Sequence, residues 1–390
     1  YFTGNVGSGT VQELSQWVEY VNSDNVSPMT ELRKQNGREK SWGVKYWGIG
    51  NENWGCGGNM RPEFYADQTR RYGTYMREYG QNKLFKIACG PPDGEYQWTD
   101  VMMKTALGSM SGLSLHHYAF NDGKIATEFD ESGWFTMMKN TLIMDEYISK
   151  HSAIMDTYDP NKKVALMVDE WGTWYKVEPG TNPGFLFQQN TMRDAITAAC
   201  NLNIFNNHCE RVRMANIAQM VNVLQAMILT KEDKMILTPT YYVFDLFKVH
   251  QNALWVKTTI QSPDYVYNNE KLRAVNCSAS IDETGKLHIS LCNIDPKSSQ
   301  QITCELKKYE PQSVSGQILT ANGMNAHNSF EHPSIVTPHT FTDYKLSKSG
   351  LKITLPPMSV VVLELEGTYE LTSSLEIKNP KLGISYDYYE

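Results

Sequence analysis

The strongest constraint on the fold is an alternation, over residues 1–250, of short apolar runs with segments of helical periodicity. One helical segment, residues 10–22, opens with the capping-box pattern Thr10-Val11-Gln12-Glu13 and then places apolar side chains on one face. Strands separated by helices in this order predict parallel β/α units. The apolar runs that we interpret as strands cover residues 44–50, 85–89, 113–115, 164–168 and 212–217. Further helices are predicted over residues 62–79, 132–156 and 188–206, with Gly80 at the position of a helix C-cap.

The number of strands limits how the sheet can close. A closed parallel barrel needs eight strands. The sequence predicts five, and Gly4-Asn5-Val6-Gly7 has the composition of a loop that follows a sixth. We therefore expect the chain to begin part-way through a barrel.

Residues 251–390 have a different character. Short β-branched stretches alternate apolar and polar positions and are separated by turn residues, which predicts an all-β sandwich. The expected strands cover residues 273–281, 286–293, 301–307, 317–320, 351–355 and 359–365. Residues 367–390 form a polar, tyrosine-rich tail to which we assign no function. The prediction is thus a β/α domain over residues 1–250 and a C-terminal β-sandwich over residues 251–390.

Charge and cysteine content argue against several classes of function. The net charge of −7 argues against nucleic-acid binding, for which a basic face is expected. No apolar stretch approaches the roughly 18–20 residues of a membrane-spanning helix, so we expect no membrane partner. The seven cysteines include no Cys-x-x-Cys pair, which favours free thiols and a cytoplasmic location. Since the chain lacks an initiator methionine and a leader, periplasmic or secreted locations stay open.

Polar residues follow four of the predicted strands. Reactive side chains of parallel β/α folds collect at the carboxyl ends of strands. Glu52 and Glu170 are both at such ends, so barrel closure would bring them to one mouth. Two carboxyl groups about 5–5.5 Å apart can cleave a glycosidic bond with retention, whereas inversion needs about 6.5–9.5 Å. The sequence leaves that choice open. The strand-end residues are Asn51-Glu52, His116-His117-Tyr118, Asp169-Glu170, and Asn216 with Gln219.

The surroundings of these residues suit a sugar. Tryptophan rings near strand ends can stack on a sugar face, and Asn51, Tyr118 and Gln219 can bond hydroxyl groups. Each feature also has an ordinary structural interpretation, as a solvated loop glutamate, a core tryptophan or a structural histidine pair. Cys56, in Gly55-Cys56-Gly57-Gly58, is interpreted as a small buried filler of a tight loop. The tryptophans considered are Trp47, Trp54, Trp98, Trp171 and Trp174.

The strings around both glutamates are more specific than the glutamates alone. Residues 46–60, Tyr-Trp-Gly-Ile-Gly-Asn-Glu-Asn-Trp-Gly-Cys-Gly-Gly-Asn-Met, resemble the acid/base segment of family 51 glycoside hydrolases, the α-L-arabinofuranosidases. Residues 168–175, Val-Asp-Glu-Trp-Gly-Thr-Trp-Tyr, resemble the nucleophile segment of that family. Residues 214–224 resemble its eighth-strand segment, residues 5–10 the end of its third strand, and residues 319–331 part of its β domain.

The resemblance implies a fold and a reaction. The fold would be the (β/α)8 TIM barrel of a clan of retaining hydrolases. In this chain the barrel would be N-terminally incomplete, with strands four to eight and the end of strand three. The reaction would release terminal α-L-arabinofuranosyl residues from arabinan or arabinoxylan oligosaccharides through a covalent glycosyl-enzyme. No metal and no organic cofactor would be needed. Because family members often form oligomers, a homo-oligomer is expected.

The resemblance also assigns roles to single residues. Glu52 would be the general acid and then the general base, and Glu170 the nucleophile. Glu52 would have to stay protonated beside a charged Glu170, so we expect burial and that neighbouring carboxylate to raise its pKa. The remaining assignments are Asn51 to the sugar 2-hydroxyl, Tyr118 to the orientation of Glu170 with His116 close by, Trp174 to the wall of the arabinose pocket, and Gln219 to a sugar hydroxyl.

Three alternatives stay open. Related enzymes act on β-xylosides or β-glucans, and the sequence does not fix the sugar. A barrel metallohydrolase would use His116, His117 and nearby carboxylates as ligands. An inactive fragment or sugar-binding module is the third, because the family's first two strands and most of its third have no counterpart here. We expect a missing segment, through truncation, clipping with the other piece still associated, or residues left out of the numbering.

Overall fold

The computed structural model describes residues 1–348 and 350–369. These form two compact units. The first unit consists of residues 1–117 and 147–169, and the second of residues 118–146 and the described residues from 170 onward. The domain boundary expected near residue 250 falls inside the second unit and stays a prediction. Most of the polar tail of residues 367–390 lies outside the described residues.

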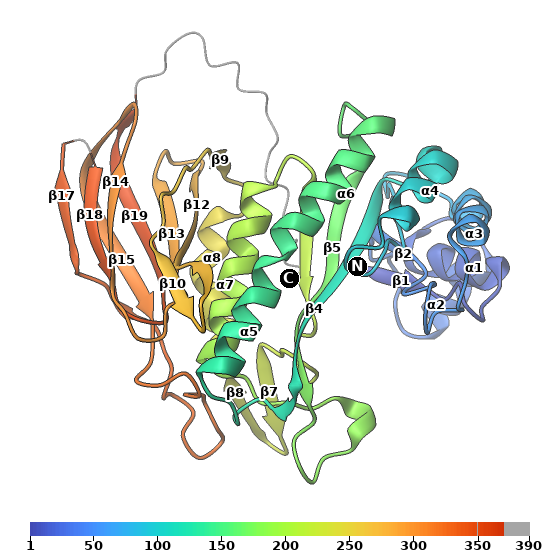
Figure 1. The fold of residues 1–390 in the computed structure, drawn as a ribbon. Coiled ribbons are helices and arrows are strands. Elements are labelled where there is room, and N and C mark those ends of the chain that lie inside the picture. The colour runs from blue at the N-terminus through green and yellow to red at the C-terminus, as the bar shows by residue number, and fades with distance from the viewer. Residues whose placement is uncertain (349, 370–390) are drawn as a thin grey trace. The chain divides into compact units, whose positions relative to one another are not determined.

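The first unit is built on short parallel strands joined by helices (Figure 1). Strand β1 pairs with β2 from Phe2↔Trp47 onward, β2 pairs with β3, and β3 pairs with the start of β4. These strands are β1 (Phe2–Gly4), β2 (Tyr46–Ile49), β3 (Phe85–Ala88) and β4 (Gly112–Ile125). Its helices are α1 (Val11–Asn22), α2 (Pro28–Gln35), α3 (Pro62–Tyr75), α4 (Tyr96–Ala106) and most of α6 (Met144–Tyr158).

Local sequence signals explain some of the helix ends. The capping box predicted before α1 is confirmed, because the Thr10 hydroxyl accepts from the Glu13 N–H and the Glu13 carboxylate accepts from the Thr10 N–H. The helix end predicted at Gly80 is wrong. Helix α3 ends at Tyr75, and Tyr79 forms a β-bridge with Asn82 instead. The single helical region predicted over residues 132–156 is two helices, α5 (Glu131–Leu142) and α6.

The second unit begins with the rest of β4 and then adds a helical layer. Helix α7 is buried along most of its length, as expected of a helix packed on several sides. Strands β12 and β13 lie against α7, as Figure 1 shows. The elements of this part are α5, β5 (Ala165–Lys176), α7 (Met192–Asn207), β6 (Val212–Ile217), the hairpin of β7 (Ile228–Lys231) and β8 (Lys234–Leu237), and α8 (Pro239–Phe247).

The C-terminal part of the second unit is all-β among the described residues, as the sequence predicted. A six-stranded antiparallel sheet has the order β16-β15-β19-β13-β12-β9, and a second sheet has the order β14-β18-β17. Strands β10 and β11 form a separate hairpin. The strands are β9 (Leu254–Val256), β10 (Asp264–Tyr267), β11 (Glu270–Arg273), β12 (Val275–Ile281), β13 (Leu287–Asn293), β14 (Gln300–Glu305), β15 (Tyr309–Leu319), β16 (His339–Thr340), β17 (Tyr344–Ser347), β18 (Gly350–Leu355) and β19 (Ser359–Tyr369).

The β/α sheet has six strands in the order β1-β2-β3-β4-β5-β6, which agrees with the five strands and one preceding loop read from the sequence. The described residues do not show a closed barrel, so closure is not confirmed. Strands β4 and β5 are longer than predicted and run from the first unit into the second. As a result, His116, Tyr118 and Glu170 lie inside strands and not beyond their ends.

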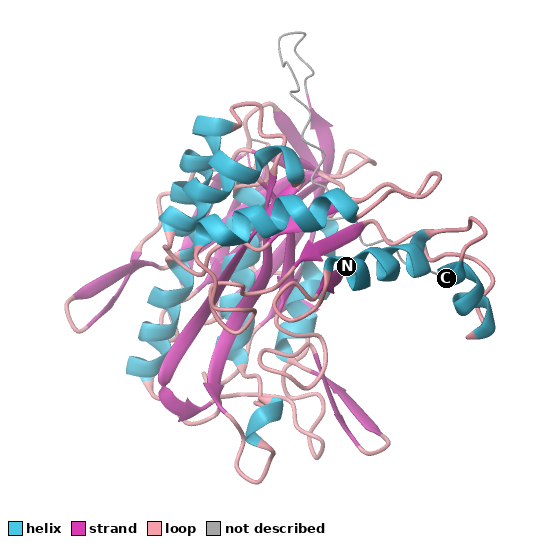
Figure 2. Cartoon of the chain, turned by 90° about the vertical axis from the view of Figure 1, so that its right-hand side faces the viewer, coloured by secondary structure: helices cyan, strands magenta, loops and turns pink. Residues whose placement is uncertain are grey.

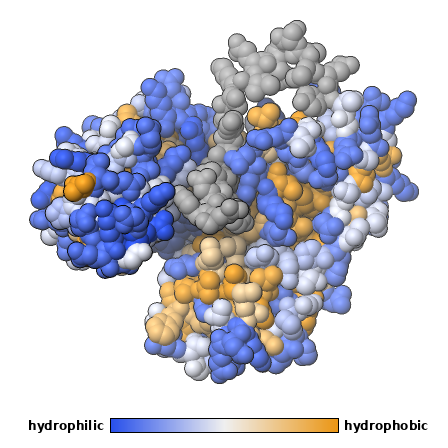
Figure 3. Space-filling view, turned by 180° about the vertical axis from the view of Figure 1, so that it is seen from behind, coloured by the Kyte–Doolittle hydropathy of each residue, from blue (hydrophilic) through white to orange (hydrophobic). Residues whose placement is uncertain are grey.

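The hydrophobicity of the surface and of the helices bears on whether the chain could cross a membrane. Figure 2 shows the mixture of helices and strands by colour, and the face seen in Figure 3 is mostly hydrophilic with hydrophobic residues in limited patches. Among the described residues, we find no helix that combines the length and the apolar character needed to cross a bilayer.

Candidate active site

The loop that follows β2 presents Glu52. Its carbonyl oxygen accepts hydrogen bonds from the backbone N–H groups of Gly55 at 2.8 Å and Gly57 at 2.9 Å, which curls the loop around it. Asn53 is fully buried, and its side-chain amide donates to the Gly57 carbonyl at 2.8 Å. Glu52 has a positive φ of 44°, a backbone conformation that non-glycine residues seldom adopt. The folded loop leaves the Glu52 carboxyl group partly exposed.

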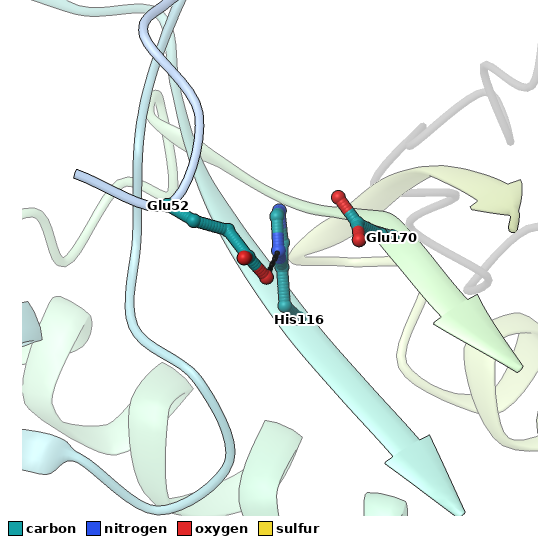
Figure 4. A group of neighbouring side chains, drawn as sticks. All are labelled: Glu52, His116 and Glu170. Atoms are coloured by element: carbon teal, nitrogen blue, oxygen red, sulfur yellow. Dashed lines mark hydrogen bonds and ion pairs between the residues drawn. The ribbon is translucent and has the colours of Figure 1, made fainter. Parts of the chain in front are cut away.

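His116 of β4 contacts this carboxyl group (Figure 4). Its Nδ1 lies 3.0 Å from Glu52 Oε1, and its Nε2 lies 3.2 Å from Asp169 Oδ1. The Tyr1 hydroxyl donates to the other oxygen of Asp169 at 2.6 Å. The side chains of His116 and Asp169 are both almost fully buried. Within the first unit, these groups form a continuous polar row that ends at Glu52.

The hydrogen bond from His116 lowers the pKa of Glu52 below its usual value. Burial acts in the opposite direction, while the Cys56 thiol, 3.3 Å from Glu52 Oε2, adds to the lowering. The expected rise in the pKa of Glu52 is therefore wrong for this arrangement. The prediction considered burial and a neighbouring carboxylate, and it left out a donor that stabilises the charged form.

Glu170 has a different partner. In the second unit, the Tyr118 hydroxyl donates to Glu170 Oε1 at 2.7 Å. Tyr118 belongs to β4 and Glu170 to β5. A hydrogen bond from a tyrosine fixes the position of one carboxylate oxygen and so helps to orient the whole carboxylate. The expected Tyr118–Glu170 contact is present in the structure.

Two aromatic rings, those of Trp174 and Phe120, lie beside the ring of Tyr118, whose hydroxyl bonds to Glu170. The Trp174 ring lies edge-on to Tyr118, with 5.0 Å between centroids, and stacks on Phe120 at 5.9 Å. Trp174 is half-buried, which suits a pocket wall. The tryptophans at positions 47, 98 and 171 are buried core residues and not stacking platforms. Trp54 is half-buried, and its indole N–H donates to the Gly90 carbonyl.

Two other predicted site residues lie at the surface. Asn51 is exposed in the loop just before Glu52, and Gln219 is exposed between β6 and β7, where its backbone N–H donates to the Val223 carbonyl. Neither position tests the sugar contacts expected of these two residues, which stay predictions.

The histidine pair does not have the arrangement of a metal site. Whereas His116 faces Glu52 and Asp169, the neighbouring His117 places its Nδ1 2.6 Å from Asp93 Oδ1. Successive residues of a strand point to opposite faces, so the two imidazoles diverge. This geometry disfavours the alternative in which both histidines bind one ion.

Three residues near these groups were missed or misjudged from sequence. Asp169 was named only as the neighbour of Glu170, and Phe120 was not considered. Cys56 was expected to be buried but is exposed, and its thiol lies 3.3 Å from Glu52 Oε2. The one usable signal was the Asp-Glu pair at the end of a predicted strand, which pointed to Asp169 as well as to Glu170.

Comparison with known proteins assigns the family. The model of the α-L-arabinofuranosidase 1 domain matches residues 6–130, and that of the α-L-arabinofuranosidase C-terminal domain matches residues 169–359. The intracellular exo-α-L-arabinofuranosidase of Bacteroides ovatus is 49% identical over 371 residues, covering 94% of this chain and 72% of that protein. The chain belongs to the family 51 α-L-arabinofuranosidases.

Solved structures of this family resemble the chain closely. A family 51 arabinofuranosidase from Xanthomonas axonopodis pv. citri matches with a TM-score of 0.92 at 48% identity, over 94% of this chain and 75% of that one. An α-L-arabinofuranosidase from Thermotoga maritima, in complex with arabinose, matches with a TM-score of 0.80 at 25% identity and the same coverage. These likenesses imply the TIM-barrel fold with a C-terminal β domain.

Proposed function

We propose that this chain is an exo-acting, retaining α-L-arabinofuranosidase that removes terminal arabinofuranosyl residues from arabinan or arabinoxylan oligosaccharides. The observation that carries the proposal is the 49% identity to an enzyme named an exo-α-L-arabinofuranosidase, which extends over both glutamate segments. The hydrogen bonds to Glu52 and Glu170 support it, because each carboxyl group has a partner suited to a different task.

In the first step, one oxygen of the Glu170 carboxylate attacks the anomeric carbon while the bond to the leaving oxygen breaks. Glu52 gives its proton to that oxygen. In the second step, Glu52 takes a proton from water, the water oxygen bonds to the anomeric carbon, and the bond to Glu170 breaks. Tyr118 holds one oxygen of Glu170 and so orients the other.

The reaction requires both carboxyl groups to reach one anomeric carbon. Within the first unit, Asp169 lies against the His116 ring that bonds to Glu52. Glu52 must alternate between acid and base. His116 favours the charged base form, and a bound sugar that excludes water favours the neutral acid form.

Further contacts to the sugar follow from the family assignment. We propose that Asn51 bonds the 2-hydroxyl, that Trp174 lines the arabinose pocket and that Gln219 bonds another hydroxyl. The half-buried ring of Trp174 beside Tyr118 supports its part. Comparing turnover of nitrophenyl α-L-arabinofuranoside with that of nitrophenyl β-D-xyloside tests the choice of sugar, and a preference for the xyloside would overturn it.

Azide rescue tests the two glutamate roles. Glu170→Ala should abolish turnover, because no nucleophile remains, and added azide should restore release of the leaving group and yield a β-configured glycosyl azide. Glu52→Ala is the matched variant. With an activated aryl substrate it still forms the glycosyl-enzyme, so azide should give the α-configured product. An α-azide from Glu170→Ala would reverse the assignment.

The barrel fold, the cellular location and the oligomeric state are further proposals. We propose that the six-stranded sheet is part of a (β/α)8 barrel, which is supported by its strand order and by the family 51 structures. A cytoplasmic location is supported by the free cysteines and by the relative named intracellular. A homo-oligomer is tested by light scattering of the purified enzyme, and a monomer at micromolar concentration would refute it.

A further inference from the structure

Phe120 is an exposed aromatic ring next to the expected sugar pocket. It is 52% exposed, although its ring stacks on Trp174 with 5.9 Å between centroids and 29° between planes. It also lies 6.2 Å from the Tyr118 ring, whose hydroxyl bonds to Glu170. Within the second unit, an aromatic surface therefore begins beside Glu170 and ends at a ring open to solvent.

The position of Phe120 is held by the surrounding structure. Its carbonyl oxygen accepts a hydrogen bond from the Asn140 side-chain amide at 3.2 Å, and Trp174 supports its ring. Burying a phenylalanine ring is favourable, so a ring left half open to solvent forgoes part of that gain. Apolar ring faces of this kind suit the C–H faces of sugars.

We propose that Phe120 is the stacking platform for the sugar unit that carries the arabinofuranosyl residue, the leaving-group subsite. This inference rests on the proposed function. Tyr118 and Trp174 flank Glu170 and would enclose the arabinose, so the next ring of the same surface meets the next sugar. Phe120 is thus a specificity-determining residue, because it contacts the part of the substrate that differs between arabinan and arabinoxylan.

The same subsite would receive an acceptor in the second step. An acceptor hydroxyl oxygen then bonds to the anomeric carbon in place of water, the bond from that carbon to Glu170 breaks, and Glu52 takes the hydroxyl proton. Both reactions start from one arabinosyl-enzyme. The ratio of transfer to hydrolysis therefore reports on acceptor binding alone, independent of the amount of folded enzyme.

The test uses α-L-arabinofuranosyl fluoride, whose leaving group has no ring, with xylobiose as acceptor. Phe120→Ala should lower the ratio of transfer to hydrolysis about three- to tenfold, the effect expected for one lost stacking contact. Hydrolysis of the fluoride without acceptor is measured for each variant as the reference, because any general loss of activity cancels in the ratio. Phe120→Tyr, which keeps the ring, should restore the ratio.

A matched control is Phe64→Ala, since Phe64 of α3 is 50% exposed and lies in the first unit. It should leave the ratio unchanged. Phe120→Leu gives the same test if the alanine variant folds poorly. An unchanged ratio in Phe120→Ala or Phe120→Leu would refute the subsite while leaving the proposed function in place. A wild-type enzyme that cannot hydrolyse the fluoride would instead refute the proposed function, and the subsite with it.

Discussion

At the scale of single residues, His116 links the protonation of Glu52 to its buried surroundings. Its hydrogen bond stabilises the Glu52 carboxylate and lowers the pKa of that group. His116→Asn should therefore raise the pKa of Glu52. Because the proposed first step needs protonated Glu52, the descending basic limb of the kcat/KM profile should move to higher pH. The measurement is kcat/KM for an arabino-oligosaccharide against pH.

His117→Asn is the control for this shift, because His117 is buried like its neighbour but bonds to Asp93. Its basic limb should stay where it is in the wild type. The position of a limb does not depend on the amount of folded enzyme, so lower stability of either variant leaves the comparison valid. A limb that moves to lower pH in His116→Asn would contradict the assignment.

Tyr118 holds one oxygen of Glu170, and its contribution can be measured. Tyr118→Phe removes the hydroxyl and keeps the ring that contacts Trp174. A hydrogen bond to a charged group contributes about 1.5–3 kcal/mol, so kcat should fall about 10- to 100-fold. The control is Tyr344→Phe, which removes a hydroxyl bonded to the Val314 carbonyl in the C-terminal β region and should leave kcat unchanged. Equal losses in both would point to a structural cause.

The residues themselves were more predictable than their contacts. Glu52 and Glu170 could be found because a polar residue after an apolar strand is visible in sequence. The Glu52–His116 contact joins residues 64 positions apart, and no local pattern encodes it. That is why the sign of the pKa shift was predicted wrongly. Cys56 was misjudged for a related reason, since its exposure depends on how the loop hydrogen bonds fold.

At the scale of elements, the loop after β2 depends on a glycine without space for a side chain. A Cβ atom on Gly57 would lie 1.9 Å from the Asn51 carbonyl oxygen, whereas one on Gly55 would meet nothing closer than 3.8 Å. Gly57→Ala must therefore displace the loop that carries Glu52. A misplacement of about 1 Å can cost about 100-fold in rate, so we expect kcat/KM to fall by about that factor.

Gly55→Ala provides the comparison within the same loop. It should keep kcat/KM within about twofold of the wild type, because the added methyl group makes only ordinary contacts. Circular dichroism of both variants separates a local change from unfolding. If Gly57→Ala kept full activity, the loop geometry around Glu52 would not matter for the reaction.

Elements with strong local signals were predicted well. Helix α1 follows from its capping box, and β13 from an apolar run with turns on both sides. Strands β4 and β5 extend well past their apolar cores, because pairing within a sheet continues through polar residues that periodicity assigns to loops. Helix α2 was missed, because its eight residues make too few turns for a helical periodicity to stand out in the sequence.

At the scale of the whole molecule, buried polar contacts join helix α7 to the C-terminal strands of the second unit. The Asn203 side-chain oxygen accepts from the hydroxyls of Ser278 at 2.7 Å and Ser290 at 2.6 Å. Asn203→Ala removes the acceptor of both serine hydroxyls and should lower the free energy of unfolding by about 1–3 kcal/mol. Thermal unfolding measures this, and kcat/KM at 25 °C should not change.

A double-mutant cycle checks that the loss comes from these contacts. Adding Ser290→Ala to Asn203→Ala should cost less than the sum of the two single losses, since the second change removes a partner that is already lost. Additive losses would mean that Asn203 acts through packing alone. The change from helical to alternating periodicity was visible in the sequence, whereas the side-chain contacts that join helix α7 to the C-terminal strands were not.

The chain passes between its two compact units at His117–Tyr118, at Glu146–Tyr147 and at Asp169–Glu170. Glu170 and Tyr118, whose hydroxyl bonds to it, thus each come directly after one of these crossing points, whereas Glu52 lies well inside the first unit. Neither unit corresponds to one uninterrupted stretch of the gene. A deletion that removes either unit would therefore also remove one of the two glutamates on which the proposed reaction depends.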